Sequence, residues 1–223
     1  MRFPNAAKGV KKIFTAEILL LIAAIAAGIT SILLITAYAS YTANSDAGAI
    51  WSSLGFLIFG TAMLVLLIVG GILNIVGYIQ AAMDEDGFKN AIVCMVFSII
   101  FGAVAVCFQA STGFLGWLGT VMNLISQVLQ LFVIVFSIGG IMRLSEKYRR
   151  DDMVKKGVTM LNIIKWLYII YFVLLIMTRV FRESAVANTI ILILTVVSLI
   201  LSAIQYVLYL VYLSSASKML KED

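Results

Sequence analysis

The sequence contains no histidine among its 223 residues. Histidine is the usual general base near neutral pH and the commonest metal ligand, so its absence excludes Ser-His and Cys-His nucleophiles and the zinc sites that need His. The densest carboxylates, Asp84, Glu85 and Asp86, directly precede an apolar run, where solvation and helix capping explain them. We therefore expect no enzyme, no cofactor and no metal site.

Proline and cysteine are also scarce, with one Pro4 and two cysteines in the chain. Transporter helices that break within the membrane often use Pro or Gly to interrupt the hydrophobic run. Without proline in these runs, we expect mostly continuous helices. Cys94 and Cys107 share one apolar run, where a helix would hold them about 20 Å apart, too far for a disulfide. We expect both to be buried apolar thiols.

Charged residues are scarce as well. They make up only 12% of the chain, whereas 63% of the residues are apolar. Soluble domains have about 25% charged and about 45–50% apolar residues. A soluble fold of this size could not cover so much apolar surface, and a disordered chain would be polar. The sequence therefore predicts that lipid is the solvent for most of this protein.

Six long apolar runs account for the excess. Each reaches the roughly 20 residues needed to cross about 30 Å of hydrocarbon, and each must be helical because lipid cannot satisfy backbone polar groups. The runs lie at about 13–38, 54–82, 88–109, 115–142, 159–179 and 189–213. The predicted fold is an all-α, polytopic integral membrane protein with six transmembrane helices in a single membrane domain over 1–223.

The basic residues predict the orientation of these helices. Nearly all Lys and Arg fall on the side that holds both termini, whereas only Arg179 and Arg182 fall on the other. By the positive-inside rule both termini are cytoplasmic, and the net charge of +5 reflects topology instead of nucleic-acid binding. We expect a bacterial inner (plasma) membrane, with anionic lipids as partners of the basic cytoplasmic face.

The entrances to the odd-numbered runs resemble one another. Val10-Lys11-Lys12 is followed by Thr15, and Val154-Lys155-Lys156 is followed by Thr159 at the same spacing, with Phe88-Lys89-Asn90 as a possible middle copy. This pattern suggests three repeated helical hairpins, a normal way to build transporters. The alternative is that the positive-inside effect alone places lysines at these helix starts.

Uncharged polar side chains follow one face of each even-numbered run. The fourth run has Asn123, Gln127 and Gln130 at helical spacing. The second has Asn74 with Gly70, Gly77 and Ala81, and the last has Ser202 and Gln205. An amide facing acyl chains would lack hydrogen bonds, so these faces line a transport path or make interhelical contacts. For the glycines, close helix packing is favoured.

Two charged residues lie inside the apolar runs near their cytoplasmic ends. Glu17 is about one turn inside the first, and Lys165 about two turns inside the fifth. They are candidates for a charge pair, although long side chains at such positions also reach the interface. Because no Asp, Glu, Lys or Arg lies near a bilayer midplane, the sequence disfavours a proton-coupled transporter.

The sequence is consistent with two different classes of function. The polar faces favour a transporter or channel for a small solute with a polar, uncharged path. The short loops and abundant Gly and Ala equally fit a structural or accessory membrane protein, which packs against a membrane protein partner or forms a homo-oligomer.

Overall fold

The computed structural model describes residues 3–42, 46–109, 111, 113–180 and 185–221. The described chain is helical, as predicted. Its helices are, in order, α1 (Pro4–Thr42), α2 (Asp46–Ala82), α3 (Gly87–Gln109), α4 (Phe114–Lys147), α5 (Asp151–Val180) and α6 (Ala185–Met219). Neither the Gly70-Gly71 doublet nor Gly139-Gly140 interrupts its helix, which confirms the expectation of continuous helices.

Five helical stretches of the described residues are long and apolar enough to cross a membrane. They are Pro4–Thr42, Ile50–Ala82, Gly87–Phe108, Phe114–Lys147 and Thr195–Met219. Helix α5 is not among these stretches of the described residues. The described part of the chain is thus all-helical, with five helical stretches of membrane-spanning character, and the span at 159–179 stays a prediction.

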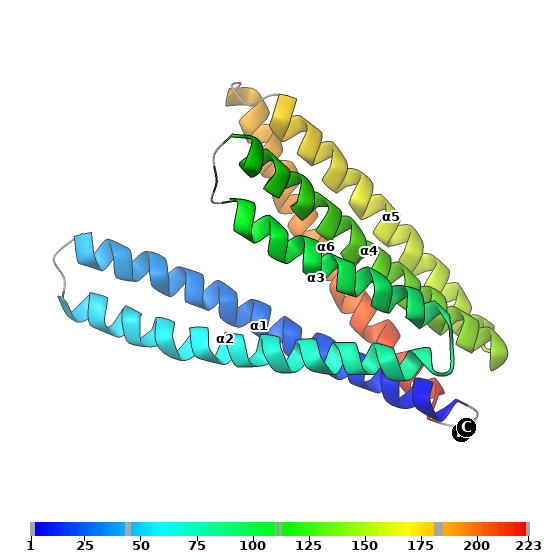
Figure 1. Cartoon of the computed structure of the whole chain (residues 1–223). Helices are drawn as coiled ribbons and strands as arrows, with labels where there is room; N and C mark the ends of the chain where they lie inside the picture. The colour runs from blue at the N-terminus through cyan, green and yellow to red at the C-terminus, as the bar shows by residue number, and fades with distance from the viewer. Residues whose placement is uncertain (1–2, 43–45, 110, 112, 181–184, 222–223) are drawn as a thin grey trace.

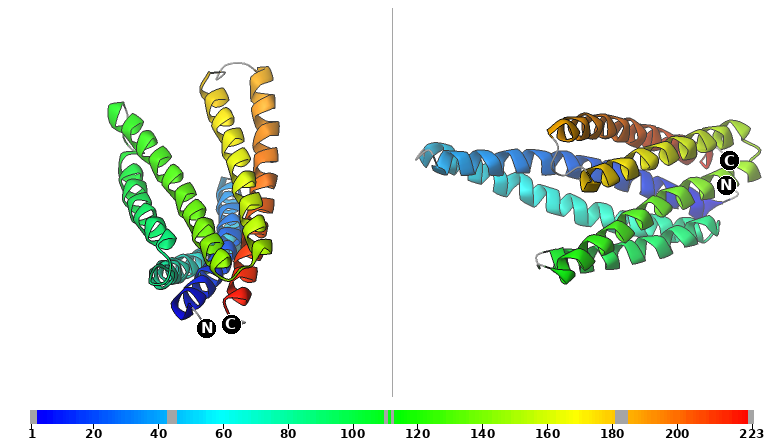
Figure 2. Two further views of the ribbon diagram at one scale, coloured as in Figure 1. Left: turned by 90° about the vertical axis from the view of Figure 1, so that its right-hand side faces the viewer. Right: turned by 90° about the horizontal axis from the view of Figure 1, so that it is seen from above.

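Consecutive helices pair as hairpins. Each odd-numbered helix packs against the helix that follows it, most extensively α1 against α2 and α3 against α4. Figures 1 and 2 show the α1–α2 hairpin diverging from the other four helices, so that the two groups meet near the start of α1 and the end of α6. Three hairpins agree with the predicted outline, but a threefold repeat in the sequence remains a hypothesis.

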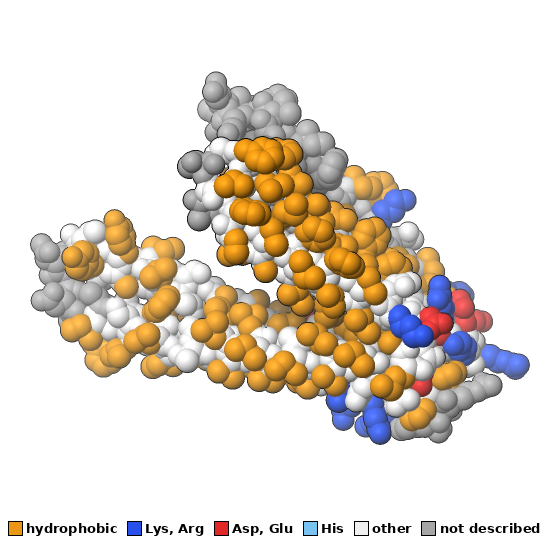
Figure 3. All heavy atoms as spheres, viewed as in Figure 1, with side chains coloured by type: hydrophobic (Ala, Val, Ile, Leu, Met, Phe, Trp, Pro, Cys, Tyr) orange, Lys and Arg blue, Asp and Glu red, His pale blue; other side chains and the backbone are white. Residues whose placement is uncertain are grey.

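The buried core lies at the end where the hairpins meet. Its fully buried side chains come from all six helices and from the residue that follows α6: Val10, Ile13, Tyr78, Phe88, Ile138, Ile141, Leu144, Ile164, Leu213 and Leu220. Figure 3 shows most of the visible acidic and basic side chains gathered at this same end, which we call the charged end, and many apolar side chains on the described helices away from it. Exposed apolar surface on that scale fits a lipid solvent.

Small residues bring α1 and α2 into close contact. A Cβ added at Gly77 would lie 2.8 Å from Ile13 Cγ1 and 2.9 Å from the carbonyl oxygen of Gly9. Ala81, one turn further along α2, is fully buried, and a Cβ at Gly70 would lie 3.1 Å from Leu20. The Gly70-Gly77-Ala81 face is therefore a packing seam, as the sequence favours for its glycines.

The acidic turn between α2 and α3 holds the charged end together. Asp84 accepts hydrogen bonds from the Ala6 backbone N–H at 2.7 Å and from the Asn5 amide at 3.1 Å, so it caps α1 and not the helix that follows it. Glu85 is buried and pairs with Lys147 at 2.6 Å and with Arg143 at 3.6 Å, both on α4. The turn between α2 and α3 thereby contacts both α1 and α4 at this end.

Asp86, the third acid of the turn, behaves differently because it is exposed. Its carboxylate lies 2.6 Å from the Lys89 ammonium one turn along the chain. The hydrogen bond from Lys89 lowers the pKa of Asp86. Solvent screening makes such an exposed pair weak, so Glu85 and not Asp86 carries the interhelical link.

The two cysteines are free, but the expectation that both are buried is wrong. Cys94 is half-buried and Cys107 is exposed. Both lie on α3, where Cys94 packs against the edge of the core and Cys107 is exposed near the far end of the helix. An apolar thiol is tolerated there because the surrounding solvent is hydrocarbon.

Candidate functional site

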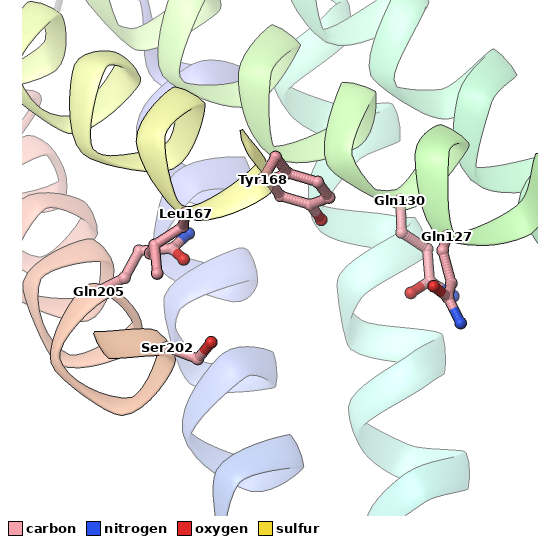
Figure 4. Close-up of a pocket in the computed structure, with 6 residues that line it drawn as sticks. All are labelled: Gln127, Gln130, Leu167, Tyr168, Ser202 and Gln205. Carbon is pink, nitrogen blue, oxygen red and sulfur yellow. The ribbon is translucent and has the colours of Figure 1, made fainter. Parts of the chain in front are cut away.

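A pocket of about 310 Å³ lies between α4, α5 and α6. Its described lining consists of Gln127, Gln130, Leu167, Tyr168, Ser202 and Gln205. Figure 4 shows the two α4 glutamines close together on one side, Ser202 and Gln205 of α6 on the other, and the Tyr168 ring between them in this view. Four of the six lining residues are side chains that the sequence singles out. We call this space the amide pocket.

Helical spacing explains why these residues share one pocket. Gln127 and Gln130 are three apart on α4, and Ser202 and Gln205 are three apart on α6, so each pair occupies one helix face. The tight turn between α4 and α5 and the α5–α6 hairpin bring these two faces together around α5. Two polar faces that are distant in sequence thereby line the same space.

The lining of the amide pocket is polar but uncharged. Glutamine supplies both N–H donors and a carbonyl acceptor, and the Ser and Tyr hydroxyls can donate or accept. The described lining contains no Asp, Glu, Lys or Arg. Its volume is at the lower end of the range for small-molecule sites. Such a pocket is suited to a small solute that carries hydrogen-bonding groups and no net charge.

Two further polar residues of α4, the predicted Asn123 and its neighbour Ser126, lie outside the lining. Asn123 is half-buried on α4 but does not line the amide pocket. Ser126, on the same helix, is buried and donates to the Ser98 carbonyl at 2.9 Å, which joins α4 to α3. The polar face of α4 therefore divides, because Ser126 serves interhelical packing and the glutamines line the pocket.

Asn74 also lies elsewhere, in a contact between α1, α2 and α6. Its amide donates to Glu17 Oε1 at 3.2 Å. Tyr206 of α6 donates to Glu17 at 2.8 Å, both to Oε2 and to the main-chain oxygen. The candidate pair of Glu17 with Lys165 is not among the salt bridges of the described residues, and Lys165 is exposed on α5. Glu17 is bound by neutral donors instead.

A second, more apolar cavity of about 560 Å³ adjoins this contact between α1 and α6. Its described lining includes Glu17 and Tyr206, together with Leu20, Leu21, Ala24, Ser202, Ala203 and Val207. Ser202 lines both this cavity and the amide pocket. The Ser202 side chain of α6 thus lies between the amide pocket and the second cavity, which contains Glu17 in its lining.

Sequence reasoning missed Tyr168 and Tyr206 as site residues. Tyr206 follows Ser202 by four residues, so it shares the predicted polar face of α6 and its helical spacing could have revealed it. Tyr168 has no comparable signal, because α5 carries no predicted polar stripe. Its place in the pocket follows from the packing of α5 against α4 and α6.

No family model matches this chain, and no curated protein or solved structure matches it either. Among the described residues, no group of three or more Cys, Asp or Glu side chains could hold a metal ion. The candidate site is therefore defined by the geometry of the amide pocket and of the neighbouring Glu17 contact.

Proposed function

We propose that this protein moves a small, uncharged polar solute across a membrane through the amide pocket. The observation that carries the proposal is the meeting of Gln127 and Gln130 with Ser202 and Gln205 around one cavity. Each amide left in hydrocarbon without a partner would cost several kcal/mol, roughly 2–7 by transfer scales. Gathering such groups around a space the size of a small molecule is what a hydrogen-bonding solute path requires.

The test is osmotic flux into proteoliposomes that contain the purified full-length protein. Vesicles are shocked with glycerol or urea, two small uncharged polar probes, and their swelling is followed by light scattering. We expect faster swelling than in protein-free vesicles for at least one probe. The Gln127→Leu/Gln130→Leu variant should return swelling to the protein-free rate.

A matched control is Asn162→Leu, which removes an exposed amide of α5 outside the pocket lining. It should keep the wild-type rate. Flux in the double glutamine variant that equals wild type would reject the amide pocket as the path. Absence of flux for both probes, with a stoichiometric partner captured by crosslinking in native membranes, would favour the accessory function.

We also propose six transmembrane spans, with both termini in the cytoplasm of a bacterial inner membrane. The position of the charged end supports this orientation, because α1 begins and α6 ends there beside the basic α4–α5 turn. Positive charge favours the cytoplasmic side. In spheroplasts, a cysteine introduced near Lys221 should resist an impermeant thiol reagent until the membrane is opened.

Anionic lipid headgroups are the proposed partners of the charged end. A cavity of about 370 Å³ between α5 and α6 has Lys155 and Lys156 in its lining. Apolar residues, including Ile163, Leu208 and Val211, form much of the remainder. Two ammonium groups beside an apolar groove suit a phosphate headgroup and its acyl chain.

A further inference from the structure

Glu17 is a carboxylate on α1, a helix long and apolar enough to span a membrane, and it contacts two other helices. It accepts hydrogen bonds from Asn74 on α2 and from Tyr206 on α6 while lying on α1. The titratable groups within its electrostatic reach are Tyr206, Tyr78 on α2 and Tyr209 on α6. No Lys or Arg forms a salt bridge with it among the described residues. Carboxylates placed this way in membranes are commonly functional.

The surroundings of Glu17 can satisfy the group in either protonation state. When ionised, it accepts one bond from the Tyr206 hydroxyl and one from the Asn74 amide N–H. When protonated, it needs an acceptor for its own O–H. The side-chain oxygen of Asn74 is buried and has no hydrogen-bond partner. A half-turn of the Asn74 amide would present that oxygen to the protonated acid.

An unpartnered buried amide oxygen carries the desolvation cost of a lost hydrogen bond and needs an explanation. A role as acceptor in the protonated state supplies one. The adjoining cavity, lined by Glu17 and bordered by Ser202, gives the carboxyl group a neighbouring space, and Ser202 also borders the amide pocket. The two sites are therefore in contact through one side chain.

We propose that Glu17 is a proton-binding site whose loading and release are coupled to solute movement through the amide pocket. The carboxylate takes one proton from hydronium in the aqueous phase, so that one O–H bond of hydronium breaks as the carboxyl O–H bond forms, and the reverse step returns the proton to water as hydronium. This coupling rests on the proposed function, whereas proton binding itself does not. It differs from the expectation from sequence, which disfavours proton coupling because no ionisable residue lies near a bilayer midplane.

The geometry favours a proton over a metal cation at this site. Both carboxylate oxygens already face N–H or O–H donors, which repel a cation. The main-chain oxygen of Glu17 also accepts from Tyr206. Among the described residues, the Asn74 side-chain oxygen is the one buried oxygen of this contact without a hydrogen-bond partner, whereas hard cations such as Na⁺ require several oxygen ligands. A sodium requirement is accordingly an outcome that would overturn the proposal.

Proton binding is tested by infrared difference spectroscopy of the reconstituted protein during a pH titration. Wild type should show the carbonyl band of a protonated carboxylic acid that Glu17→Gln lacks. The matched control Glu146→Gln makes the same chemical change at an exposed carboxylate on α4 and should keep the band. If Glu17→Gln does not fold, Tyr206→Phe serves instead and should shift the frequency of the band. A band unchanged in both Glu17→Gln and Tyr206→Phe would overturn the proposal.

Coupling is tested in the same vesicles with a trapped pH-sensitive dye. An imposed glycerol or urea gradient should change the internal pH with wild type and Glu146→Gln, but not with Glu17→Gln. Solute flux without a pH change, or flux that needs Na⁺, would overturn coupling and leave the proposed function standing. If wild type passes neither probe, the proposed function and the coupling both fail, and the infrared band alone decides proton binding.

Discussion

The hydroxyl of Tyr206 lies 2.8 Å from Oε2 of Glu17 and 2.8 Å from the main-chain oxygen of the same residue. This contact joins α6 to α1, near the opposite ends of the sequence. It is one of few links between the diverging α1–α2 hairpin and the remaining helices (Figure 2). Its strength should therefore determine how firmly that hairpin is attached.

Tyr206→Phe should weaken this attachment. The substitution keeps the ring but removes the donor to the carboxylate, and loss of a hydrogen bond to a charged group costs about 1.5–3 kcal/mol. We expect a decrease of that size in the free energy of unfolding, measured by denaturant titration in detergent micelles. Tyr41→Phe, at an exposed tyrosine of α1, is the control and should leave stability unchanged.

Gly77→Ala should destabilise the α1–α2 hairpin. The new Cβ would lie within 2.9 Å of Ile13 and of the Gly9 backbone, so the helices must separate. Overpacking of this kind costs about 1–3 kcal/mol. Gly71→Ala is the matched control, because its Cβ meets nothing within 4 Å and alanine favours a helix by up to about 1 kcal/mol. Equal effects of the two changes in the same unfolding assay would contradict the packing seam.

Glu85→Gln should loosen the charged end. It removes the buried carboxylate that pairs with Lys147 and Arg143 of α4, and we expect a loss of about 1.5–3 kcal/mol in unfolding free energy. Faster proteolysis of the α2–α3 turn is a second readout. Asp86→Asn changes an exposed acid of the same turn, and a comparable loss in that variant would show that Glu85 has no special role.

Replacing Lys155 and Lys156 with glutamine should reduce retention of anionic lipid. Each lysine near an anionic headgroup contributes about 1 kcal/mol, or about fivefold in affinity. Native mass spectrometry of protein with bound phosphatidylglycerol measures the effect. The control changes Lys8 and Lys11 of α1, which lie outside this cavity. Equal loss in both double variants would indicate general charge attraction and not a site.

The fold and part of the site could be predicted from sequence because both depend on local pattern. Apolar runs predict helices in lipid, and spacing of three or four residues places Gln127 with Gln130 and Ser202 with Gln205. The same spacing could not say which face meets which. The relative rotation of packed helices directs Asn74 to Glu17 and leaves Asn123 outside the amide pocket.

The hydrogen-bond partners that lie far apart in the sequence could not be predicted. Asp84 caps α1 from a turn far along the chain, although its position suggested a cap for the helix that follows. Glu17 was expected to reach the interface or meet Lys165, yet its donors are Asn74 and Tyr206. Such contacts depend on how the hairpins assemble, which no local pattern encodes.

The most direct test of the account is whether water fills the amide pocket. In a background with Cys94→Ala and Cys107→Ala, the Gln130→Cys and Ser202→Cys variants are reconstituted and exposed to a small, charged, water-soluble thiol reagent. Ile204→Cys, at an exposed apolar position of α6, reports lipid-facing reactivity. We predict that both pocket cysteines react much faster than the cysteine at position 204. Equally slow reaction at all three positions would mean a dry interface and would contradict the proposed solute path.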